Sequence, residues 1–543
     1  MRCDTIHIVI YAARAALDAR TELTVLQDKL SELWSYCIMT ESYRPHYHVS
    51  VPFGWANDPN GTIWFQGKAH LFYQHYPHKP EWGPMHWNHV TTKDFVHWEQ
   101  RPVALYPDRP YELVCGCCSG STVEKDGRLW LMYTAAQPMM QRQCMAVSED
   151  GDHFEKYADN PILTAEMLSP EIYEEDFRDP RIFRHGDSWY LIAGIRYVDG
   201  GRRVEPAPTR QRETTNPRQP DPKHKKEGWG NLCLLKSGDL FHWSYIGRLL
   251  YPQPEYGEDF YKLDGVYECP DYFVAENGAE VLLSSPQNLP SAGHLYQNIH
   301  SVLFMLGHLD FDTGRFDVRT IGEVDSGFDF YAAQTLRMPD GRVIMIAWKE
   351  MWDRSYPSRA EEWAGTYTLP RELTVEGDRL IQRPVREIEA CRGKPVRVSE
   401  AAVENGAAEL PGVAGNVIEL RFTLEPDTAE KAGVKLFCGG EHETLLYYDR
   451  GEGLLVFDRS RSGEEITGRD RDVNVRVLEL GRRDRIELDL FLDVSSLEAF
   501  IDGGRHTMTG NVYPDPAADR GIWFFAEDGR ATFRAVEKFD ILL

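Results

Sequence analysis

Two patterns of apolar positions divide the chain. Within residues 13–36, four leucines recur at spacings of three and four, which predicts an amphipathic helix. These leucines are Leu23, Leu26, Leu30 and Leu33. From about residue 46 onwards, short apolar and aromatic runs alternate with Gly, Pro, Asn and Asp, which predicts β-strands joined by turns. Clear examples of such runs are residues 69–73, 129–133 and 189–193.

A weak repeat indicates how these strands are grouped. Residues 94–98, 152–154 and 239–243 resemble one another, and their histidines His97, His153 and His242 are 56 and 89 residues apart. The second gap contains a Pro-, Arg- and Lys-rich segment of 30 residues, 199–228, and without it the gap is 59. A period of this length is typical of the four-stranded blades of a β-propeller.

The apolar pattern changes again after about residue 375. Ile418, Leu420, Phe422 and Leu424 alternate with polar residues, and the same alternation returns at residues 486–493. A period of two with one polar face predicts antiparallel sheets, most simply a β-sandwich with one face in water.

The expected fold is therefore all-β in three parts. Residues 1–45 form a short N-terminal helical extension, residues 46–375 a five-bladed β-propeller, and residues 376–543 a β-sandwich. The basic segment 199–228 fits a surface loop, a partner contact or part of the rim of an active site.

Composition narrows the classes of function. The chain has 543 residues and a net charge of −25, which argues against binding to a nucleic-acid backbone or to an anionic membrane surface. The apolar stretch at residues 6–13 is too short to span a bilayer, and the residues before it are barely basic, so no secretory signal is expected. We therefore expect a cytoplasmic protein. The oligomeric state, including a homo-oligomer, is left open.

Cysteine usage gives no sign of a disulfide framework or a metal site. The 10 cysteines are few for this length, and a reduced state is the simpler reading. Cys115, Cys117 and Cys118 lie close together, but no second pair follows at the spacing of a zinc site. Neither a metal ion nor an organic cofactor is expected.

Three acidic residues stand out as candidate chemistry. Asp58 and Asp179 each precede a proline, which forces an extended backbone, and Asp179 has Arg178 beside it. Glu268 lies in an apolar and aromatic neighbourhood, where desolvation is expected to raise its pKa. Taken singly, the three fit an ordinary turn, a surface salt bridge and a turn at the edge of a blade.

The pattern that the three make together is more informative. They lie on three different repeats, and equivalent positions of propeller blades converge on the central channel. Carboxylates gathered there repel one another, so that one is expected to stay protonated. A nucleophile paired with an acid is what cleavage of a glycosidic bond requires, and the nearby aromatic residues offer flat faces to a sugar.

The chain resembles glycoside hydrolase family 32, the β-fructofuranosidases, which include invertases, fructan hydrolases and sucrose-6-phosphate hydrolases. The resemblance begins at residue 44 and covers nearly all of the chain after it. It is carried by short motifs in the family's order: Arg-Pro-His-Tyr-His at 44–48, Trp-Ala-Asn-Asp-Pro-Asn-Gly at 55–61, Phe-Tyr-Gln at 72–74, Trp-Gly at 82–83, Ser-Gly-Ser at 119–121, Arg-Asp-Pro at 178–180, Glu-Cys-Pro at 268–270, Asp-Phe-Tyr at 329–331, Pro-Arg-Glu-Leu at 370–373, Asp-Arg-Ser-Arg-Ser-Gly at 458–463 and Ser-Ser-Leu-Glu-Ala-Phe at 495–500.

The resemblance implies a retaining hydrolase that releases terminal β-D-fructofuranosyl units from sucrose, sucrose 6-phosphate or short fructo-oligosaccharides. By position, Asp58 matches the nucleophile, Glu268 the general acid/base, and Asp179 the residue that stabilises the transition state. The matching positions of the fructose pocket are Asn57, Gln74, Trp82, Ser119, Arg178 and Tyr331. The small residues Ala56 and Cys118 replace larger ones of the family and are expected to loosen the pocket wall. The alternatives are fructosyl transfer, exo-hydrolysis of inulin or levan, and a carbohydrate-binding protein without catalysis.

Overall fold

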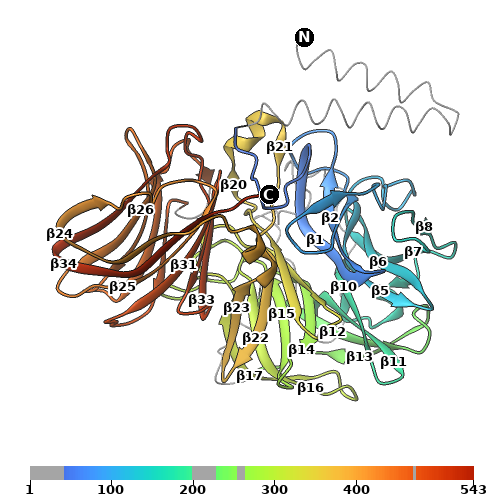
Figure 1. The fold of residues 1–543 in the computed structure, drawn as a ribbon. Helices are drawn as coiled ribbons and strands as arrows, with labels where there is room; N and C mark the ends of the chain where they lie inside the picture. The colour runs from blue at the N-terminus through green and yellow to red at the C-terminus, as the bar shows by residue number, and fades with distance from the viewer. Residues whose placement is uncertain (1–41, 199–227, 254–262, 264, 469–472) are drawn as a thin grey trace, which may run out of the picture. The chain divides into compact units, whose positions relative to one another are not determined.

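The fold is described from a computed structural model over residues 42–198, 228–253, 263, 265–468 and 473–543. The predicted helix at 13–36 and the basic segment 199–227 lie outside these residues. Residues 45–543 form one compact unit, whose regular secondary structure is almost entirely β-strand (Figure 1). Within the described residues, none of the helices is long and apolar enough to cross a membrane.

Five sheets of antiparallel strands form the blades of a β-propeller, as the repeat predicted. The first two blades consist of β1 (Gly54–Phe65), β2 (Lys68–Tyr76), β3 (His86–Thr92) and β4 (Trp98–Gln100), and of β5 (Gly116–Lys125), β6 (Arg128–Gln137), β7 (Met140–Ser148), β8 (Glu155–Lys156) and β9 (Leu163–Thr164). The third and fourth consist of β10 (Ile172–His185), β11 (Ser188–Tyr197), β12 (Trp229–Ser237) and β13 (Trp243–Arg248), and of β14 (Tyr267–Val274), β15 (Glu280–Pro286), β16 (Leu303–Leu309) and β17 (Phe316–Glu323). The fifth consists of β18 (Tyr331–Arg337), β19 (Val343–Trp348), β22 (Arg371–Glu376) and β23 (Arg379–Pro384).

The blades close into a ring through their first strands. The strands β1, β5, β10, β14 and β18 contact one another in cyclic order, with β18 returning to β1. The short strand β21 (Trp363–Ala364), which belongs to the chain after β19, pairs in parallel with β1 and adds to the closure. A side chain on any first strand therefore lies close to side chains from the neighbouring blades.

The repeat seen in the sequence corresponds to one turn that recurs in the first three blades. Between the third and fourth strands, Asp94, Asp150 and Asp239 each accept a hydrogen bond from the ring Nδ1 of a histidine three residues later, at 2.7 to 2.8 Å. Each carboxylate also accepts backbone N–H groups of its own turn. The three histidines that marked the repeat therefore occupy equivalent turns, and the capping carboxylate of the second blade belongs to Asp150, two residues before Asp152.

The strand β23 ends the propeller at Pro384, which lies after the predicted boundary at residue 375. The described residues include the 3₁₀ helices η1 (Ala165–Met167), η3 (Pro357–Glu361) and η4 (Arg386–Cys391). The last of these leads into the C-terminal sheet. The short strand β20 (Arg354–Ser355) pairs with β29 (Thr467–Gly468), so the long loop after β19 reaches the C-terminal strands.

The C-terminal strands form a sandwich-like sheet around one apolar core (Figure 1). Its members are β24 (Val396–Glu409), β25 (Ile418–Glu425), β26 (Lys431–Gly439), β27 (His442–Asp449), β28 (Leu454–Arg461), β30 (Val475–Glu479), β31 (Ile486–Asp493), β32 (Ser496–Ile501), β33 (His506–Asn511) and β34 (Gly521–Asp540). The first half of β34 pairs with β26 and the second half with β25, so this long strand serves both halves of the sheet.

The alternation predicted for β25 and β31 is confirmed on the core side. The four alternating apolar residues of each strand lie in the sandwich core, and the fifth apolar residue of β31, Phe491, lies in a second cluster with residues of the propeller. The expectation of one wet face is wrong at Glu419, which is fully buried and binds Arg392 of the chain leaving the propeller at 2.6 Å. This face of the sheet is covered by the propeller, and sequence alternation alone does not reveal such a cover.

Candidate functional site

Every first strand of the propeller carries an irregularity at the same depth. In β1, β10, β14 and β18, two residues face a single residue of the neighbouring strand, which defines a β-bulge. The two residues that form each bulge are 57–58 in β1, 179–180 in β10, 269–270 in β14 and 332–333 in β18. In β5 the extra residue is Ser119. A bulge changes the direction of its side chains from the regular up-and-down alternation of a strand. Here five bulges do this around the ring of first strands.

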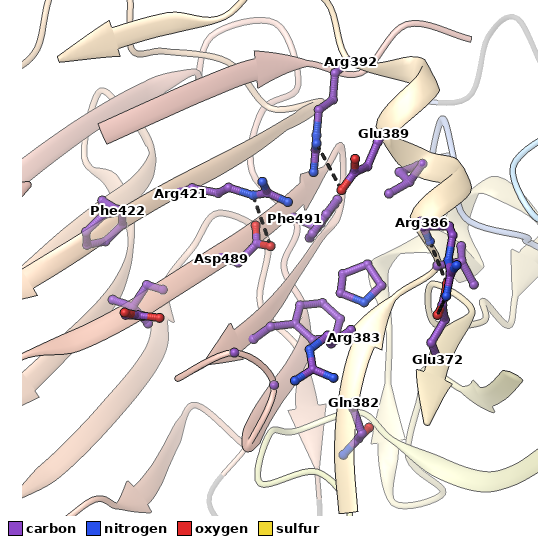
Figure 2. A pocket seen from close by; sticks show the side chains of 18 of the residues that line it. Glu372, Gln382, Arg383, Arg386, Glu389, Arg392, Arg421, Phe422, Asp489 and Phe491 are labelled. Atoms are coloured by element: carbon purple, nitrogen blue, oxygen red, sulfur yellow. Dashed lines mark hydrogen bonds and ion pairs between the residues drawn. The ribbon is translucent and has the colours of Figure 1, made fainter. Parts of the chain in front are cut away.

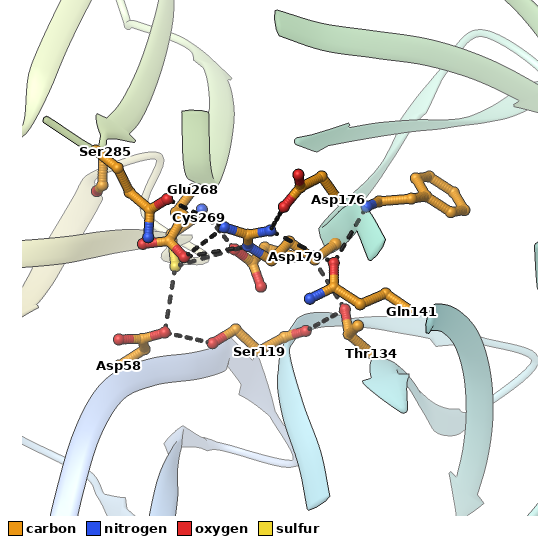
Figure 3. A network of polar contacts seen from close by, with 12 residues as sticks. Asp58, Ser119, Thr134, Gln141, Asp176, Asp179, Glu268, Cys269 and Ser285 are labelled. Atoms are coloured by element: carbon orange, nitrogen blue, oxygen red, sulfur yellow. Dashed lines mark hydrogen bonds and ion pairs between the residues drawn. The ribbon is translucent and has the colours of Figure 1, made fainter. Parts of the chain in front are cut away.

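Asp58 lies in the bulge of β1 and is held by donors from three strands. Its Oδ1 accepts Asn57 Nδ2 at 3.0 Å, and its Oδ2 accepts Gln74 Nε2 at 2.7 Å and Ser119 Oγ at 2.5 Å. Trp55 Nε1 in turn donates to Asn57 Oδ1 at 2.8 Å. Figure 3 shows Asp58 and Ser119 pointing toward each other from β1 and β5. These neutral donors fix the carboxylate without neutralising its charge.

Asp179 lies in the bulge of β10 and has a positive backbone φ of 59°, so the extended backbone expected before Pro180 is wrong at this residue. Its backbone N–H donates to Thr134 Oγ1 at 3.0 Å, and its Oδ2 accepts the backbone N–H of Cys269 at 3.1 Å. A residue without a glycine's freedom seldom adopts this conformation, so the two hydrogen bonds hold a strained backbone in place.

Glu268 precedes the bulge of β14 and is held by a cation and a phenol. Its Oε1 accepts Arg178 Nε at 3.1 Å and Nη2 at 3.0 Å, and its Oε2 accepts the Tyr331 hydroxyl at 2.7 Å. The sequence predicted apolar and aromatic surroundings, and it did not place the guanidinium of Arg178 against this carboxylate.

Arg178 connects the acidic residues of the site. Besides Glu268, it donates to Asp176 Oδ1 at 2.9 Å, and its Nε lies 3.9 Å from Asp179 Oδ2. Burial alone would lower the pKa of Arg178, but the charges of Glu268, Asp176 and Asp179 outweigh burial and raise it. Arg178 therefore stays a cation and offsets part of the repulsion among the carboxylates.

Cys269 lies where the three acids meet. Its Sγ is 3.5 Å from Asp58 Oδ2 and 3.9 Å from Asp179 Oδ2, and it follows Glu268 directly in the chain (Figure 3). Burial, reinforced by the charges of Asp58, Asp179 and Glu268, raises the pKa of this thiol well above its usual value. The thiol is therefore an uncharged donor. Burial and the charge of Glu268 likewise raise the pKa of Tyr331.

All nine residues singled out in the sequence lie on or beside the first strands. The side chains of Asn57, Gln74 and Ser119 are fully buried against Asp58, and Tyr331 contacts Glu268. Trp82 is half-buried and packs against Cys118, Cys115 and Ala136. Ala56 and Cys118 are both fully buried.

The sequence did not reveal the buried polar residues behind the carboxylates. The Thr134 hydroxyl accepts the Asp179 N–H and lies within donor distance of the Ser119 carbonyl, at 3.1 Å, and of Gln143 Oε1, at 3.0 Å. Gln143 Nε2 donates to the Phe177 carbonyl at 2.8 Å. Asp176 binds Arg178 and also Arg196 Nε at 2.9 Å. Thr134, which directly follows the apolar run 129–133, is a fully buried polar residue. Its burial is the property that sets it apart, but burial is not visible in a single sequence.

The three carboxylates are only 3 to 5% exposed, so a substrate must bring its reacting bond to them. Asp58 is held by the neutral donors Asn57, Gln74 and Ser119 and is suited to attack an electrophilic carbon. Arg178 and Tyr331 fix the orientation of the Glu268 carboxyl, which places it to exchange a proton with a bound substrate. Such an arrangement can perform a double displacement at a glycosidic carbon.

The comparisons with known proteins agree with this chemistry. The family model "Glycosyl hydrolases family 32 N-terminal domain" matches residues 48–202 and 223–384, and "Glycosyl hydrolases family 32 C terminal" matches residues 387–541. A sucrose-6-phosphate hydrolase of Zymomonas mobilis is 35% identical over 521 residues, which cover 93% of each chain.

Two solved structures are similar over almost the whole chain. A sucrose-6-phosphate hydrolase of Lactobacillus gasseri has a TM-score of 0.77 at 27% identity, with 95% of this chain and 96% of that chain covered. A variant of a β-fructofuranosidase of Bombyx mori, solved in complex with sucrose, has a TM-score of 0.73 at 30% identity, with 95% and 98% covered.

Proposed function

This chain belongs to glycosyl hydrolase family 32, and from that membership we propose that it is a β-fructofuranosidase that hydrolyses sucrose or sucrose 6-phosphate. The proposal rests on the family match over both halves of the chain and on the names of the relatives. The observation that carries the mechanism is the meeting of three carboxylates from three blades around Cys269.

In the proposed first step, the Asp58 carboxylate attacks C2 of the fructosyl unit. Glu268 gives its proton to the departing glycosidic oxygen as the C2–O bond breaks, which leaves a fructosyl ester on Asp58. Asp179 binds fructose hydroxyls and stabilises the positive charge that develops at C2. Asn57, Gln74, Trp82, Ser119, Arg178 and Tyr331 complete the proposed substrate pocket.

In the second step, the Glu268 carboxylate removes a proton from a water molecule. The resulting hydroxide attacks C2, the ester bond to Asp58 breaks, and fructose leaves. No redox change occurs, and the proton that Glu268 lost in the first step returns in the second. An acceptor sugar in place of water would give fructosyl transfer.

We predict that Asp58→Asn lowers kcat by several orders of magnitude, because an amide oxygen is a poor nucleophile. Sucrose, sucrose 6-phosphate, short fructo-oligosaccharides, inulin and levan are incubated with each protein, and the products are identified. From sucrose and sucrose 6-phosphate, the expected products are fructose with equimolar glucose or glucose 6-phosphate. An accumulation of longer oligosaccharides at high sucrose would point to transfer.

The matched control is Asp312→Asn, an exposed aspartate in the loop between β16 and β17. It should leave kcat unchanged. Near-normal hydrolysis by a folded Asp58→Asn protein would contradict the assigned nucleophile, and an inactive wild-type chain on all five substrates would contradict the function itself. The expected cytoplasmic location is a separate prediction, which cell fractionation tests.

A further inference from the structure

Two hollows lie between the fifth blade and the C-terminal sheet, away from the first strands. The larger has a volume of about 510 Å³ and is lined by β23 and η4 on one side and by β25, β31 and β32 on the other (Figure 2). Arg386, Arg392 and Arg421 project into it, and each forms an ion pair with Glu372, Glu389 or Asp489. The charges of these three arginines are balanced within the protein.

The smaller hollow, of about 420 Å³, differs in its charge. Its walls are Arg379, Arg483, Arg485, Glu487, Asp502, Arg505 and His506. Four arginines thus face two carboxylates in a protein whose net charge is −25. Four neighbouring guanidinium groups repel one another unless anions offset their charges.

The two carboxylates of the small hollow do not pair with Arg379 or Arg483. Glu487 pairs with Arg485 at 2.8 Å, and Asp502 accepts the backbone N–H of Glu487 at 3.0 Å. Arg505 pairs at 2.6 Å with Glu376, which lies outside the hollow. Among the described residues, no carboxylate lies within ion-pair distance of Arg379 or Arg483.

Arg379 and Arg483 come from different halves of the molecule. Arg379 begins β23, the outermost strand of the fifth blade, whereas Arg483 lies in the turn before β31. Arg379 Nη1 lies 3.3 Å from His506 Nε2, an arrangement that suits only a neutral imidazole. Burial, together with the charge of Arg379, lowers the pKa of His506 to about 4, so this ring accepts hydrogen bonds at neutral pH.

We propose that this hollow is a binding site for a phosphate dianion, either inorganic phosphate or the phosphate group of a sugar phosphate, held between Arg379 and Arg483. Planar guanidinium groups bind phosphate oxygens in pairs, and two of them here have no competing carboxylate. The site is separate from the catalytic carboxylates, which lie on first strands. The anion would join the fifth blade to the C-terminal sheet.

Isothermal titration calorimetry with inorganic phosphate tests the proposal, with glucose 6-phosphate as a second ligand and glucose as a neutral one. We expect saturable binding of phosphate at one site per chain and none of glucose. Equal affinity for both phosphates would mean that the phosphate group alone is recognised, whereas tighter binding of glucose 6-phosphate would mean that the site also contacts the sugar. The double variant Arg379→Gln/Arg483→Gln should bind phosphate at least about tenfold more weakly.

The matched control is Arg482→Gln, which removes one exposed arginine from the same turn but does not line the hollow. It should bind phosphate as the wild-type chain does. Unchanged binding by the double variant would overturn the proposal, as would the absence of wild-type binding up to about 10 mM phosphate. Both altered arginines are exposed, so the double variant is expected to fold.

Discussion

The side chain of Glu350 shows how far a single residue's ionisation depends on its place in the fold. It is 1% exposed, and its Oε1 accepts the backbone N–H of Gly365 at 2.7 Å. Gly365 packs directly on Ala56, next to the strand segment that holds Asp58. Burial raises the pKa of Glu350 to about 8, against which the nearby charge of Arg359 acts only in part. The carboxyl is therefore mostly neutral at pH 7.

We predict that Glu350→Gln reduces the loss of stability at alkaline pH. Because the folded pKa lies above the unfolded one, the stability that the neutral carboxyl contributes is complete below about pH 4.5 and is lost as the pH rises toward 8. Glutamine has no proton to lose and keeps an oxygen for Gly365. The variant should match the wild type at pH 5 and exceed it at pH 9, by a free energy of unfolding on the order of 4 kcal/mol.

Thermal unfolding measured from pH 5 to pH 9 checks this prediction. The exposed residue change Glu276→Gln serves as the control and should follow the wild-type curve. Parallel curves for Glu350→Gln and the wild type would show that the carboxyl does not titrate in this interval.

At the scale of strands, the recurring bulges decide where the functional side chains point. Thr134, on the second strand of the second blade, contacts two of these bulges at once. It lies within donor distance of the carbonyl of Ser119, whose hydroxyl binds Asp58, and it accepts the N–H of Asp179. One hydroxyl thus sets the distance between two catalytic strands.

We predict that Thr134→Val lowers kcat about 10- to 100-fold, because small displacements of catalytic groups are costly. Valine has the same shape but leaves the Asp179 N–H without its acceptor. Steady-state kinetics with sucrose should show a much smaller change in KM. Thr134→Ser keeps the hydroxyl and should recover most of kcat. Equal losses in the valine and serine variants would contradict a role for the hydrogen bonds.

The strands also show what the sequence could and could not predict. The prolines that follow Asp58 and Asp179 marked two places where the hydrogen-bond ladder between strands breaks, because proline has no backbone N–H to donate. The bulge at Tyr331 has no such mark, because alanines occupy residues 332 and 333. Thr134 carried no recognisable signal in the sequence, because its partner Asp179 belongs to the next blade. Contacts between blades depend on closure of the ring, which no local pattern encodes.

At the scale of the whole molecule, the propeller and the C-terminal sheet are joined by buried charges. Asp329 of the fifth blade accepts Arg354 and Tyr356 on one oxygen, and Arg459 and the Asn511 N–H on the other, all at 2.6 to 2.8 Å. Burial alone would raise the pKa of Asp329, but the charges of Arg459 and Arg354 outweigh it and lower the pKa. Asp329 lies two residues before Tyr331, so this junction also supports the residue that holds Glu268.

We predict that Arg459→Met lowers the free energy of unfolding by about 3 to 5 kcal/mol, because it leaves Asp329 buried with fewer cationic partners. Urea unfolding followed by tryptophan fluorescence measures the loss. Arg461→Met is the matched control on the same strand: its side chain is exposed and pairs with Glu443, so it should cost no more than about 1 kcal/mol. Similar losses in the two variants would contradict the distinction between buried and exposed pairs.

The parallel pairing of β21 with β1 has a consequence for the making of the protein. Gly54 and Trp363 meet across this pair, although one is translated near the start of the chain and the other near the end of the propeller. During synthesis on the ribosome, Asp58 is part of the nascent chain long before the propeller ring can close. The catalytic apparatus is therefore assembled late in synthesis, and a prematurely terminated product that lacks the fifth blade would be inert.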